Sequence, residues 1–338
     1  MAGTVLVSGG SGYIAGYVIR QLVGEGWTVR TTVRNLAREA EVRRVLAVDN
    51  AKLSFFGADL ESDAGWAEAM AGCSHVAHVA SPFPATAPKH DDELIVPARD
   101  GALRALRAAK AAGVRRFVMT SSTAAIGYGH AGVERPYTEA EWTNVHGPNL
   151  SAYVKSKTIA ERAARDWVAR EGGGIEFCTV NPSLVLGPVL SADMSTSVEA
   201  VKKLLDGSVP GLPNLSFPAV DVRDIADLHV RALNAPNMAG ERFIGSGPTA
   251  TMADMAVILK RRLGTEARRV PTIKLPDFLV RIAAMFDPVM RQVTGELSKP
   301  KTMDASHARD KLGWKTRPIE ESVVDTARSL IDLGIVKV

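Results

Sequence analysis

The sequence predicts an α/β protein built on a doubly wound parallel sheet, followed by a smaller and mostly helical region. Two observations favour this fold. Over residues 4–181 short apolar runs alternate with longer helical ones, and a glycine-rich turn joins the first apolar run to the first helix. Strands that alternate with helices pair in parallel, with helices packed on both faces of the sheet. After residue 182 prolines multiply and this alternation ends.

Six strands are predicted from short runs of apolar, β-branched and aromatic residues bounded by turns. They are Val5–Val7, Thr28–Val33, Leu53–Phe56, Val76–Val79, Phe117–Thr120 and Glu176–Val180. Between them we predict the helices Gly12–Val23, Glu93–Ala111 and Ser151–Arg170. The later helices are predicted at Met194–Leu205, Asp224–Leu233, Met252–Leu263, Pro276–Met290 and Glu320–Ile331. Two short strands, near Phe217–Val220 and Arg242–Ile244, are predicted to return to the main sheet.

Composition narrows the class of protein. The hydrophobic share of 46% and the charged share of 23% are those of globular proteins and exclude a disordered or fibrous chain. The net charge of +4 comes from scattered basic pairs, so no nucleic-acid partner is predicted. No apolar run approaches the roughly 18 residues of a membrane span, and no secretory signal precedes the first strand. The two cysteines, Cys73 and Cys178, indicate reduced thiols in the cytoplasm rather than a disulfide framework.

The turn after the first strand reads Ser-Gly-Gly-Ser-Gly-Tyr-Ile-Ala-Gly and begins at Ser8. Its first glycine permits a tight turn, and Gly12 lets the backbone approach a diphosphate at the N-terminus of the helix. Ala15 stands where a third glycine usually allows close packing of helix and strand. A plain tight turn could show the same pattern, but its place after the first strand predicts a dinucleotide site in a Rossmann-type domain. The predicted contacts are Gly9, Gly12, Tyr13 and Ile14.

The end of the second strand indicates which dinucleotide binds. A site for NAD usually places an acidic residue there, which binds the ribose 2′-hydroxyl. Here no acid lies between Glu25 and Glu39, whereas Arg34 ends the strand and Arg38 follows one helical turn later. Two guanidinium groups can clamp the 2′-phosphate of NADP, unless both are merely solvated surface residues. We therefore predict NADP(H), with NAD as the alternative.

The ends of the third and fourth strands extend this site. Asp59 and Leu60 suit a contact to the adenine end of the cofactor, because they follow the third strand directly. Ala80 and Ser81 follow the fourth strand and are expected to line the ribose and nicotinamide side.

One tyrosine stands out among the five. Only Tyr153 has a lysine four residues later, and Lys157 lies on the same face of the helix after the fifth strand. An ammonium about 4 Å from the phenol would lower its pKa by up to roughly three units, toward the range in which proton transfer is efficient. Lys157 could also hold the cofactor ribose. The fifth strand ends in Ser121 and Ser122, which point to opposite sides, so only one hydroxyl can face the ligand crevice.

With these motifs, the chain resembles the extended short-chain dehydrogenases/reductases. The most similar branch holds dihydroflavonol reductases, cinnamoyl-CoA reductases and yeast-type ketone and methylglyoxal reductases. The resemblance covers nearly the whole chain and is carried by Val5–Gly16, Thr31–Arg34, His78–Pro82, Phe117–Ser122, Tyr153–Lys157, Asn181–Pro188, Asp221–Asp224 and Gly313-Trp314. It implies that Ser122, Tyr153 and Lys157 are catalytic. It also implies that Pro182 and Ser183 belong to the cofactor site.

Two departures from the branch concern the substrate. Flavonoid reductases usually carry a polar residue where this chain has Gly127. The Asn-Trp-Tyr-Cys-Tyr signature of cinnamoyl-CoA reductases is replaced by Leu-Ser-Ala-Tyr, ending at Tyr153. The resemblance therefore does not imply the substrate of either group. We expect Pro82–Pro88 and the loops of Gly187–Pro218 to shape a mostly apolar pocket.

Together these patterns predict an NADPH-dependent reductase of an aldehyde or ketone, without a metal, in a cytoplasmic monomer or homodimer. The NADP-binding Rossmann domain would comprise residues 1–181 with returns near 217–245. An interleaved substrate-binding domain would comprise residues 182–216 and 246–338. One alternative is an NAD-dependent nucleotide-sugar epimerase or dehydratase, which uses the same Tyr-Lys pair but is disfavoured by Arg34. The other is a non-catalytic NADP-sensing protein, in which that pair is generally missing.

Overall fold

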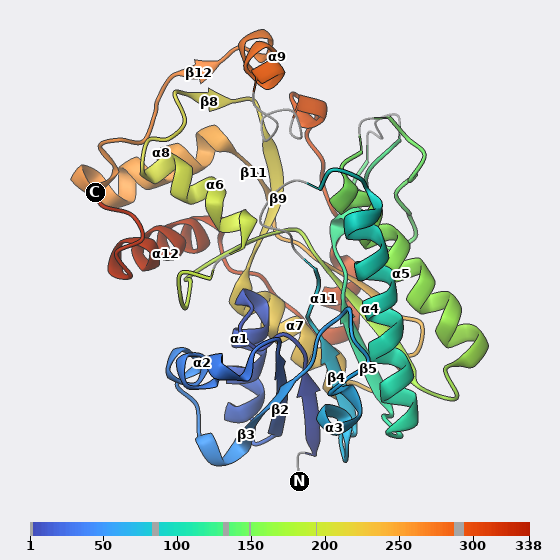
Figure 1. Cartoon of the computed structure of the whole chain (residues 1–338). Helices are drawn as coiled ribbons and strands as arrows, with labels where there is room; N and C mark the ends of the chain where they lie inside the picture. Colours follow the sequence, from blue (N-terminus) through green and yellow to red (C-terminus); the bar gives the residue numbers. More distant parts are fainter. Residues whose placement is uncertain (1–2, 83–87, 131–134, 149, 194, 287–293) are drawn as a thin grey trace.

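The computed structural model describes residues 3–82, 88–130, 135–148, 150–193, 195–286 and 294–338. Its centre is a seven-stranded parallel sheet with the strand order β10-β6-β5-β4-β1-β2-β3 (Figure 1). The strands are β1 (Thr4–Val7), β2 (Thr28–Val33), β3 (Leu53–Gly57), β4 (His75–His78), β5 (Arg116–Thr120), β6 (Glu176–Pro182) and β10 (Arg242–Gly245). The predicted fold class is confirmed, and each of the six strands predicted from the alternating pattern is present.

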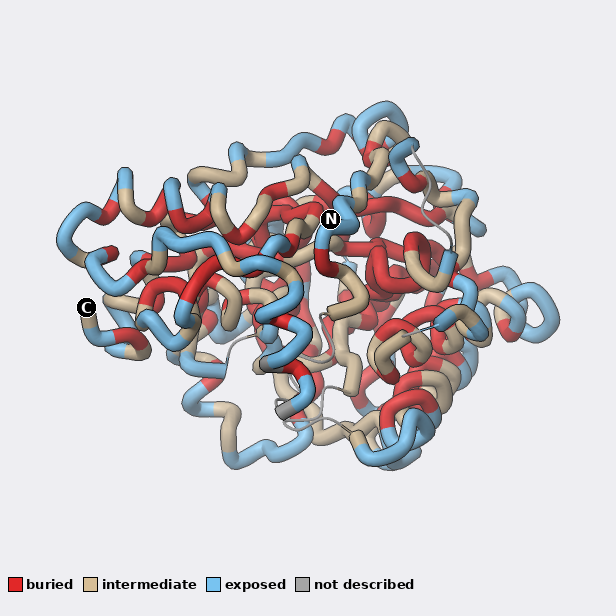
Figure 2. Tube along the Cα trace, turned by 90° about the horizontal axis from the view of Figure 1, so that it is seen from above, coloured by how far each residue is buried: buried red, intermediate tan, exposed pale blue. Residues whose placement is uncertain are grey.

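Helices cover both faces of this sheet (Figure 1). One face carries α1 (Tyr13–Gly24), α2 (Glu39–Leu46) and α7 (Val222–Asn234), and the other carries α3 (Trp66–Met70), α4 (Asp92–Ala111) and α5 (Ala152–Glu171). Side chains of a strand alternate between the two faces. Val5 and Val7 therefore join the core under α1 and α7, whereas Leu6 joins the core under α3 and α4. Figure 2 shows these buried strands in the middle of the molecule.

The elements after residue 182, apart from α7 and β10, form a second region. Its three-stranded sheet consists of β7 (Leu184–Leu186), β9 (Ser216–Asp221) and β11 (Thr249–Thr251), and β8 (Leu212–Pro213) pairs with β12 (Lys274–Leu275). The helices here are α6 (Thr196–Leu205), α8 (Met252–Leu263), α9 (Asp277–Phe286), α11 (Ser306–Leu312) and α12 (Ile319–Asp332). Because β7 follows β6 after one residue, the three-stranded sheet starts at the carboxyl end of the main sheet.

Short 3-10 helices occur in both regions. They are η1 (Leu36–Arg38), η2 (Asn50–Lys52), η3 (Thr123–Ala125), η4 (Gly264–Ala267) and η5 (Thr294–Glu296).

The predicted return of Phe217–Val220 to the main sheet is wrong. β9 pairs with β7 and β11, whereas Arg242–Gly245 does join the main sheet beside β6. Both sheets bury an apolar strand equally well, so the apolar run at Ala219 and Val220 did not distinguish them. The predicted helix Pro276–Met290 corresponds to α9, and its last residues lie outside the described part of the chain.

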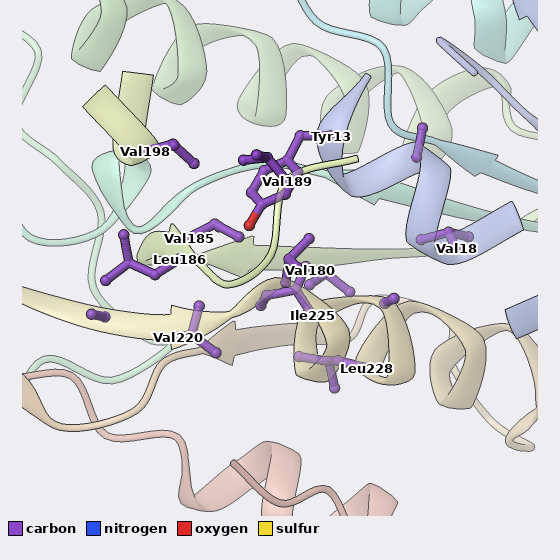
Figure 3. Packing of buried hydrophobic residues seen from close by; sticks show 14 of the residues in the cluster. Tyr13, Val18, Val180, Val185, Leu186, Val189, Val198, Val220, Ile225 and Leu228 are labelled. Atoms are coloured by element: carbon purple, nitrogen blue, oxygen red, sulfur yellow. The ribbon is translucent and has the colours of Figure 1, made fainter. Parts of the chain in front are cut away.

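One apolar core connects the two regions (Figure 3). It joins α1, β6 and α7 to β7 and β9 through Tyr13, Val18, Val180, Ile225, Leu228, Val185 and Val220. Two phenol hydroxyls strengthen the connection, because Tyr13 donates to the carbonyl of Gly187 over 2.7 Å and Tyr17 donates to that of Pro188 over 2.9 Å. The loop after β7 is thereby fixed against α1. Among the described residues, no helix is long and apolar enough to cross a membrane.

Candidate active site

The predicted site residues lie on one side of the parallel sheet, at the carboxyl ends of its strands. Every strand of the main sheet runs in the same direction, so Arg34, Ser81, Ser122 and Pro182 all lie at or just beyond carboxyl ends. The strand order reverses at β1, whose neighbours are β2 and β4. In doubly wound sheets this switch point is where ligands bind.

The glycine turn needs its glycines for its backbone conformation and for close packing against β2. Gly9 has a positive φ of 74°, and a Cβ at Gly10 would lie 2.2 Å from Oγ1 of Thr31. Gly12 caps α1 without a side chain, so the first backbone N–H groups of the helix have no capping partner from that residue. These features fit the diphosphate of a dinucleotide. The side chain of Tyr13 points to Gly187, which leaves its backbone for such a contact.

The two arginines proposed for the 2′-phosphate differ in their surroundings. Arg34 is exposed, and no hydrogen bond or salt bridge joins it to another residue in the described ranges. Arg38 forms salt bridges of 3.1 Å with Glu41 and with Asp193, and these hydrogen bonds raise the pKa of its guanidinium. Such exposed pairs stabilise a fold by about 0–1 kcal/mol, so Arg38 can exchange them for a phosphate. Arg34 is therefore the better placed of the two.

The other predicted cofactor residues are held by their neighbours. The hydroxyl of Ser8 accepts from the backbone N–H of Ala80 over 3.0 Å, which fixes the end of β4 beside the glycine turn. Asp59 accepts from the N–H of Glu61, and Leu60 packs partly against the core. The N–H of Ser183 donates to Gly245, so the segment that contains Pro182 stays against β10.

The three residues proposed as catalytic come together beside β4. The half-buried Tyr153 shares a hydrogen bond with the Ser122 hydroxyl. Lys157 is buried, and its ammonium donates to Oγ of Ser81 over 3.0 Å and lies 5.8 Å from the centre of the Tyr153 ring. The neighbouring Ser121 donates instead to Glu161, two turns further along α5 than Tyr153.

The expected lowering of the Tyr153 pKa by Lys157 is wrong for this structure. Burial raises the pKa of the phenol, and the hydrogen bond to Ser122 only partly opposes it. Burial also lowers the pKa of Lys157 to about 8, against the opposing field of Glu161. The sequence showed the spacing of the pair, but not that desolvation would dominate both pKa values.

Sequence reasoning missed a polar cluster behind the catalytic helix. Glu161 follows Lys157 by one turn and is fully buried, with Arg242 of β10 and Asn181 of β6 bonded to its carboxylate. The spacing of four residues between Lys157 and Glu161 could have indicated that both side chains lie on one face of the helix. Arg242 could not be found in this way, because it comes from a distant strand.

The space around Gly127 is closed rather than open. A Cβ there would lie 3.2 Å from Cε of Met303 and 3.2 Å from Cδ2 of Tyr137. A larger polar residue at this position would therefore require both side chains to move. Of the predicted pocket wall at Pro82–Pro88, residues 83–87 lie outside the described part of the chain.

Comparison with known proteins agrees with this geometry. Residues 5–244 match the NAD dependent epimerase/dehydratase family. A cinnamoyl-CoA reductase of Medicago truncatula is 31% identical over 98% of this chain and 96% of its own length. A dihydroflavonol 4-reductase of Hordeum vulgare is 33% identical over 98% of this chain and 91% of its own length.

The fold has a similar solved structure. The yeast methylglyoxal/isovaleraldehyde reductase, solved with NADPH, superimposes with a TM-score of 0.81 at 25% identity and covers 98% of this chain and 100% of its own. The resemblance predicted from the motifs is thus confirmed. The chain belongs to the NAD dependent epimerase/dehydratase family, and within it to the extended short-chain dehydrogenases/reductases related to cinnamoyl-CoA and dihydroflavonol reductases.

Proposed function

We propose that this protein is an oxidoreductase that uses NADPH to reduce an aldehyde or ketone to the alcohol. The observation that carries the proposal is the meeting of three side chains at the switch point of the sheet. The Tyr153 and Ser122 hydroxyls share a hydrogen bond, and the Lys157 ammonium lies on the cofactor side, against Ser81. The similarity to reductases along almost the whole chain supports the same activity.

The glycine turn and the ends of β2 and β4 would hold the cofactor. The N-terminus of α1 offers N–H groups to the diphosphate, and Arg34 offers an exposed guanidinium to the 2′-phosphate. Ala80 and Ser81 would line the ribose and nicotinamide side. When bound, NADPH supplies the hydride that reduces the carbonyl carbon.

Two hydroxyls would receive the carbonyl oxygen. Ser122 can hold the oxygen with one hydrogen bond, and Tyr153 can hold it with a second and donate its proton through it. Because burial raises the pKa of Tyr153, the phenol stays protonated and ready to donate at neutral pH. The same burial would make the resulting phenolate costly. The Lys157 ammonium, 5.8 Å from the ring centre, offsets that cost and favours the transfer.

The proposed cofactor-binding and substrate-binding roles correspond to different regions of the chain. We infer that the main sheet and its helices bind the cofactor, and that the elements after residue 182, apart from α7 and β10, shape the substrate side. The packing of Met303 and Tyr137 against Gly127 leaves no space for a larger polar side chain, which disfavours substrates that need a polar contact there.

Turnover of a panel of aldehydes and ketones, followed by NADPH absorbance, tests the proposal. Reduction of at least one class, with NADPH preferred over NADH, is the expected result. An epimerase or dehydratase would instead purify with tightly bound NAD and convert UDP-sugars. Tight NADPH binding without turnover of either substrate class would indicate a sensing protein.

A further inference from the structure

A buried carboxylate lies on the catalytic helix beyond the proposed active residues. Glu161 of α5 follows Lys157 by four residues and Tyr153 by eight, so all three lie along one face of the helix. The Glu161 side chain is 0% exposed. Removing a carboxylate from water costs several kcal/mol unless charge and hydrogen bonds compensate. A fold that retains such a group must therefore supply partners for it.

Glu161 is surrounded by donors. Its two oxygens accept hydrogen bonds from Ser121 Oγ (2.5 Å), Asn181 Nδ2 (2.8 Å), Thr179 Oγ1 (3.2 Å), Arg165 Nε (3.2 Å) and Arg242 Nε (2.7 Å) and Nη2 (3.3 Å). The two guanidinium groups keep the pKa of the carboxyl low, against the burial that would raise it. Glu161 is thus ionised at neutral pH.

Arg242 is itself fixed by the loops around the site. Its guanidinium donates to the carbonyls of Ala125, Glu139 and Glu141, and it lies 3.8 Å from the centre of the Trp142 ring. The bond from Arg242 to Glu161 therefore ties the loops that follow β5 to the catalytic helix. The Glu161 carboxylate is therefore held in place by contacts from β6, from β10 and, through Arg242, from the loops after β5.

Two connections run from Glu161 to the proposed catalytic groups. Asn181 bonds the carboxylate with its Nδ2 and also donates from Nδ2 to the carbonyl of Ser122 over 3.1 Å. Ser121, the neighbour of Ser122, bonds the carboxylate directly. The second connection is electrostatic, because the negative charge acts on Lys157 one turn away.

We propose that Glu161 is a positioning residue of the active site, which acts on the reaction through the charge of Lys157 and the placement of Ser122. This inference rests on the proposed function. Among the residues that the structure describes, Ser81, Tyr153, Glu161 and His78 interact with Lys157. Burial and the neighbouring ammonium lower the pKa of His78 to about 3, so His78 is neutral. Glu161 is the negative charge that favours the ammonium form of Lys157.

The direct test replaces Glu161 by glutamine and follows Lys157 without turnover. Reductive ¹³C-methylation gives each lysine an NMR signal, and Lys157→Arg identifies the signal of interest. In Glu161→Gln we expect Lys157 to titrate about one pH unit or more lower than in wild type, because the variant has no negative charge one turn away. The alkaline limit of carbonyl reduction should move by the same amount.

Glu161→Asp separates the two connections. It keeps the charge, so the Lys157 titration should stay within a few tenths of a unit of wild type, whereas the shorter side chain withdraws from Ser121 and Asn181. We expect kcat to fall about tenfold while the KM for NADPH stays unchanged, because this withdrawal affects the placement of Ser122 rather than cofactor binding.

A matched control lies at the other end of the same two strands. Glu176 of β6 pairs with the largely buried Arg116 of β5, far along the strands from Ser122 and Asn181. Glu176→Gln removes a carboxylate from an arginine in the same way, so it should lower stability without moving the Lys157 titration. Should Glu161→Gln fail to fold, the double variant Glu161→Gln/Arg242→Gln removes both buried charges and carries the same test.

The outcomes are distinct. A folded glutamine variant with wild-type Lys157 titration and wild-type kcat would overturn the proposal. If no carbonyl is reduced by the wild-type protein, the proposed function fails, and the NMR titration still decides whether Glu161 controls Lys157.

Discussion

At the scale of single residues, the proposed proton transfer depends most on the charge of Lys157. Its pKa is lowered to about 8 by burial, so the ammonium is present below that pH and is lost as the pH rises through it. We expect kcat/KM for NADPH to decline above about pH 8. This decline should be absent in Lys157→Met, which should be slow at every pH. Steady-state rates measured from about pH 6 to 10, a range that spans the Lys157 pKa, test for this decline.

Lys155 provides the control for this profile. It lies two residues away on the same helix, is more exposed, and donates to Asp91 over 2.6 Å. Lys155→Met should keep both the rate and the decline. If the decline persists in Lys157→Met, another group causes it.

We propose that the preference for NADPH over NADH depends on Arg34. Arg34→Asp should raise the KM for NADPH about thirtyfold, because a charge-assisted contact to the phosphate is worth on the order of 2 kcal/mol, and should leave the KM for NADH nearly unchanged. Arg44→Asp makes the same charge change at an exposed site on α2 and should affect neither cofactor. Equal effects of Arg34→Asp on the two cofactors would show that Arg34 is only a surface residue.

Residues differ in how far the sequence predicted their roles. The spacing of Tyr153 and Lys157 indicated that they share a helix face, and the family resemblance pointed to Ser122, whose hydroxyl the structure joins to Tyr153. The direction of the Tyr153 pKa was not predictable, because burial dominates it and burial depends on the whole fold. Arg242 was missed because its contact with Glu161 spans 81 residues of sequence.

At the scale of elements, the regular alternation made the main sheet predictable. The central strands, such as β1 and β5, are almost fully buried and consist mainly of apolar residues, which the sequence shows directly. The short helices α2 and α3 were missed, because eight and five residues give too few turns for a clear periodicity. β9 was assigned to the wrong sheet, because an apolar run does not specify which edge it pairs with.

The join between β1 and α1 offers a test of the glycine turn. A methyl group at Gly10 would lie 2.2 Å from Oγ1 of Thr31, whose hydroxyl is held by the carbonyl of Val7. Gly10→Ala should therefore cost about 1–3 kcal/mol of stability and weaken NADPH binding, as measured by denaturant unfolding and cofactor titration.

Gly24 at the end of α1 is the matched position. A Cβ there meets no atom of the described residues within 4 Å, so Gly24→Ala should be neutral or slightly stabilising. Similar losses in the two variants would mean that the turn has no special need for a glycine at residue 10.

At the scale of the whole molecule, cofactor binding should stabilise the fold. Its proposed contacts come from the ends of β1, β2, β4 and β6 and from α1, so unfolding destroys the site. NADPH at a hundred times its Kd should add about 2.7 kcal/mol to the free energy of unfolding, which raises Tm by a few degrees. NADH at the same concentration should raise Tm less. A melting temperature that does not respond to NADPH would contradict the cofactor assignment.

The shared core fixes the proposed substrate side of the molecule relative to the proposed cofactor side. Tyr13 and Tyr17 of α1 bond the loop after β7, and the same helix begins at the glycine turn. A movement of the second region would therefore be transmitted through α1 to the glycine turn, where we propose that the cofactor binds.

The measurement that tests the account most directly is the rate of Tyr153→Phe with its best carbonyl substrate. This change removes one oxygen and keeps the ring, so the fold and the Kd for NADPH should hardly change. The kcat for reduction should fall by roughly 10²–10⁴, the contribution of a positioned acid. A folded Tyr153→Phe protein that reduces the carbonyl at a rate near that of wild type would contradict the proposed mechanism.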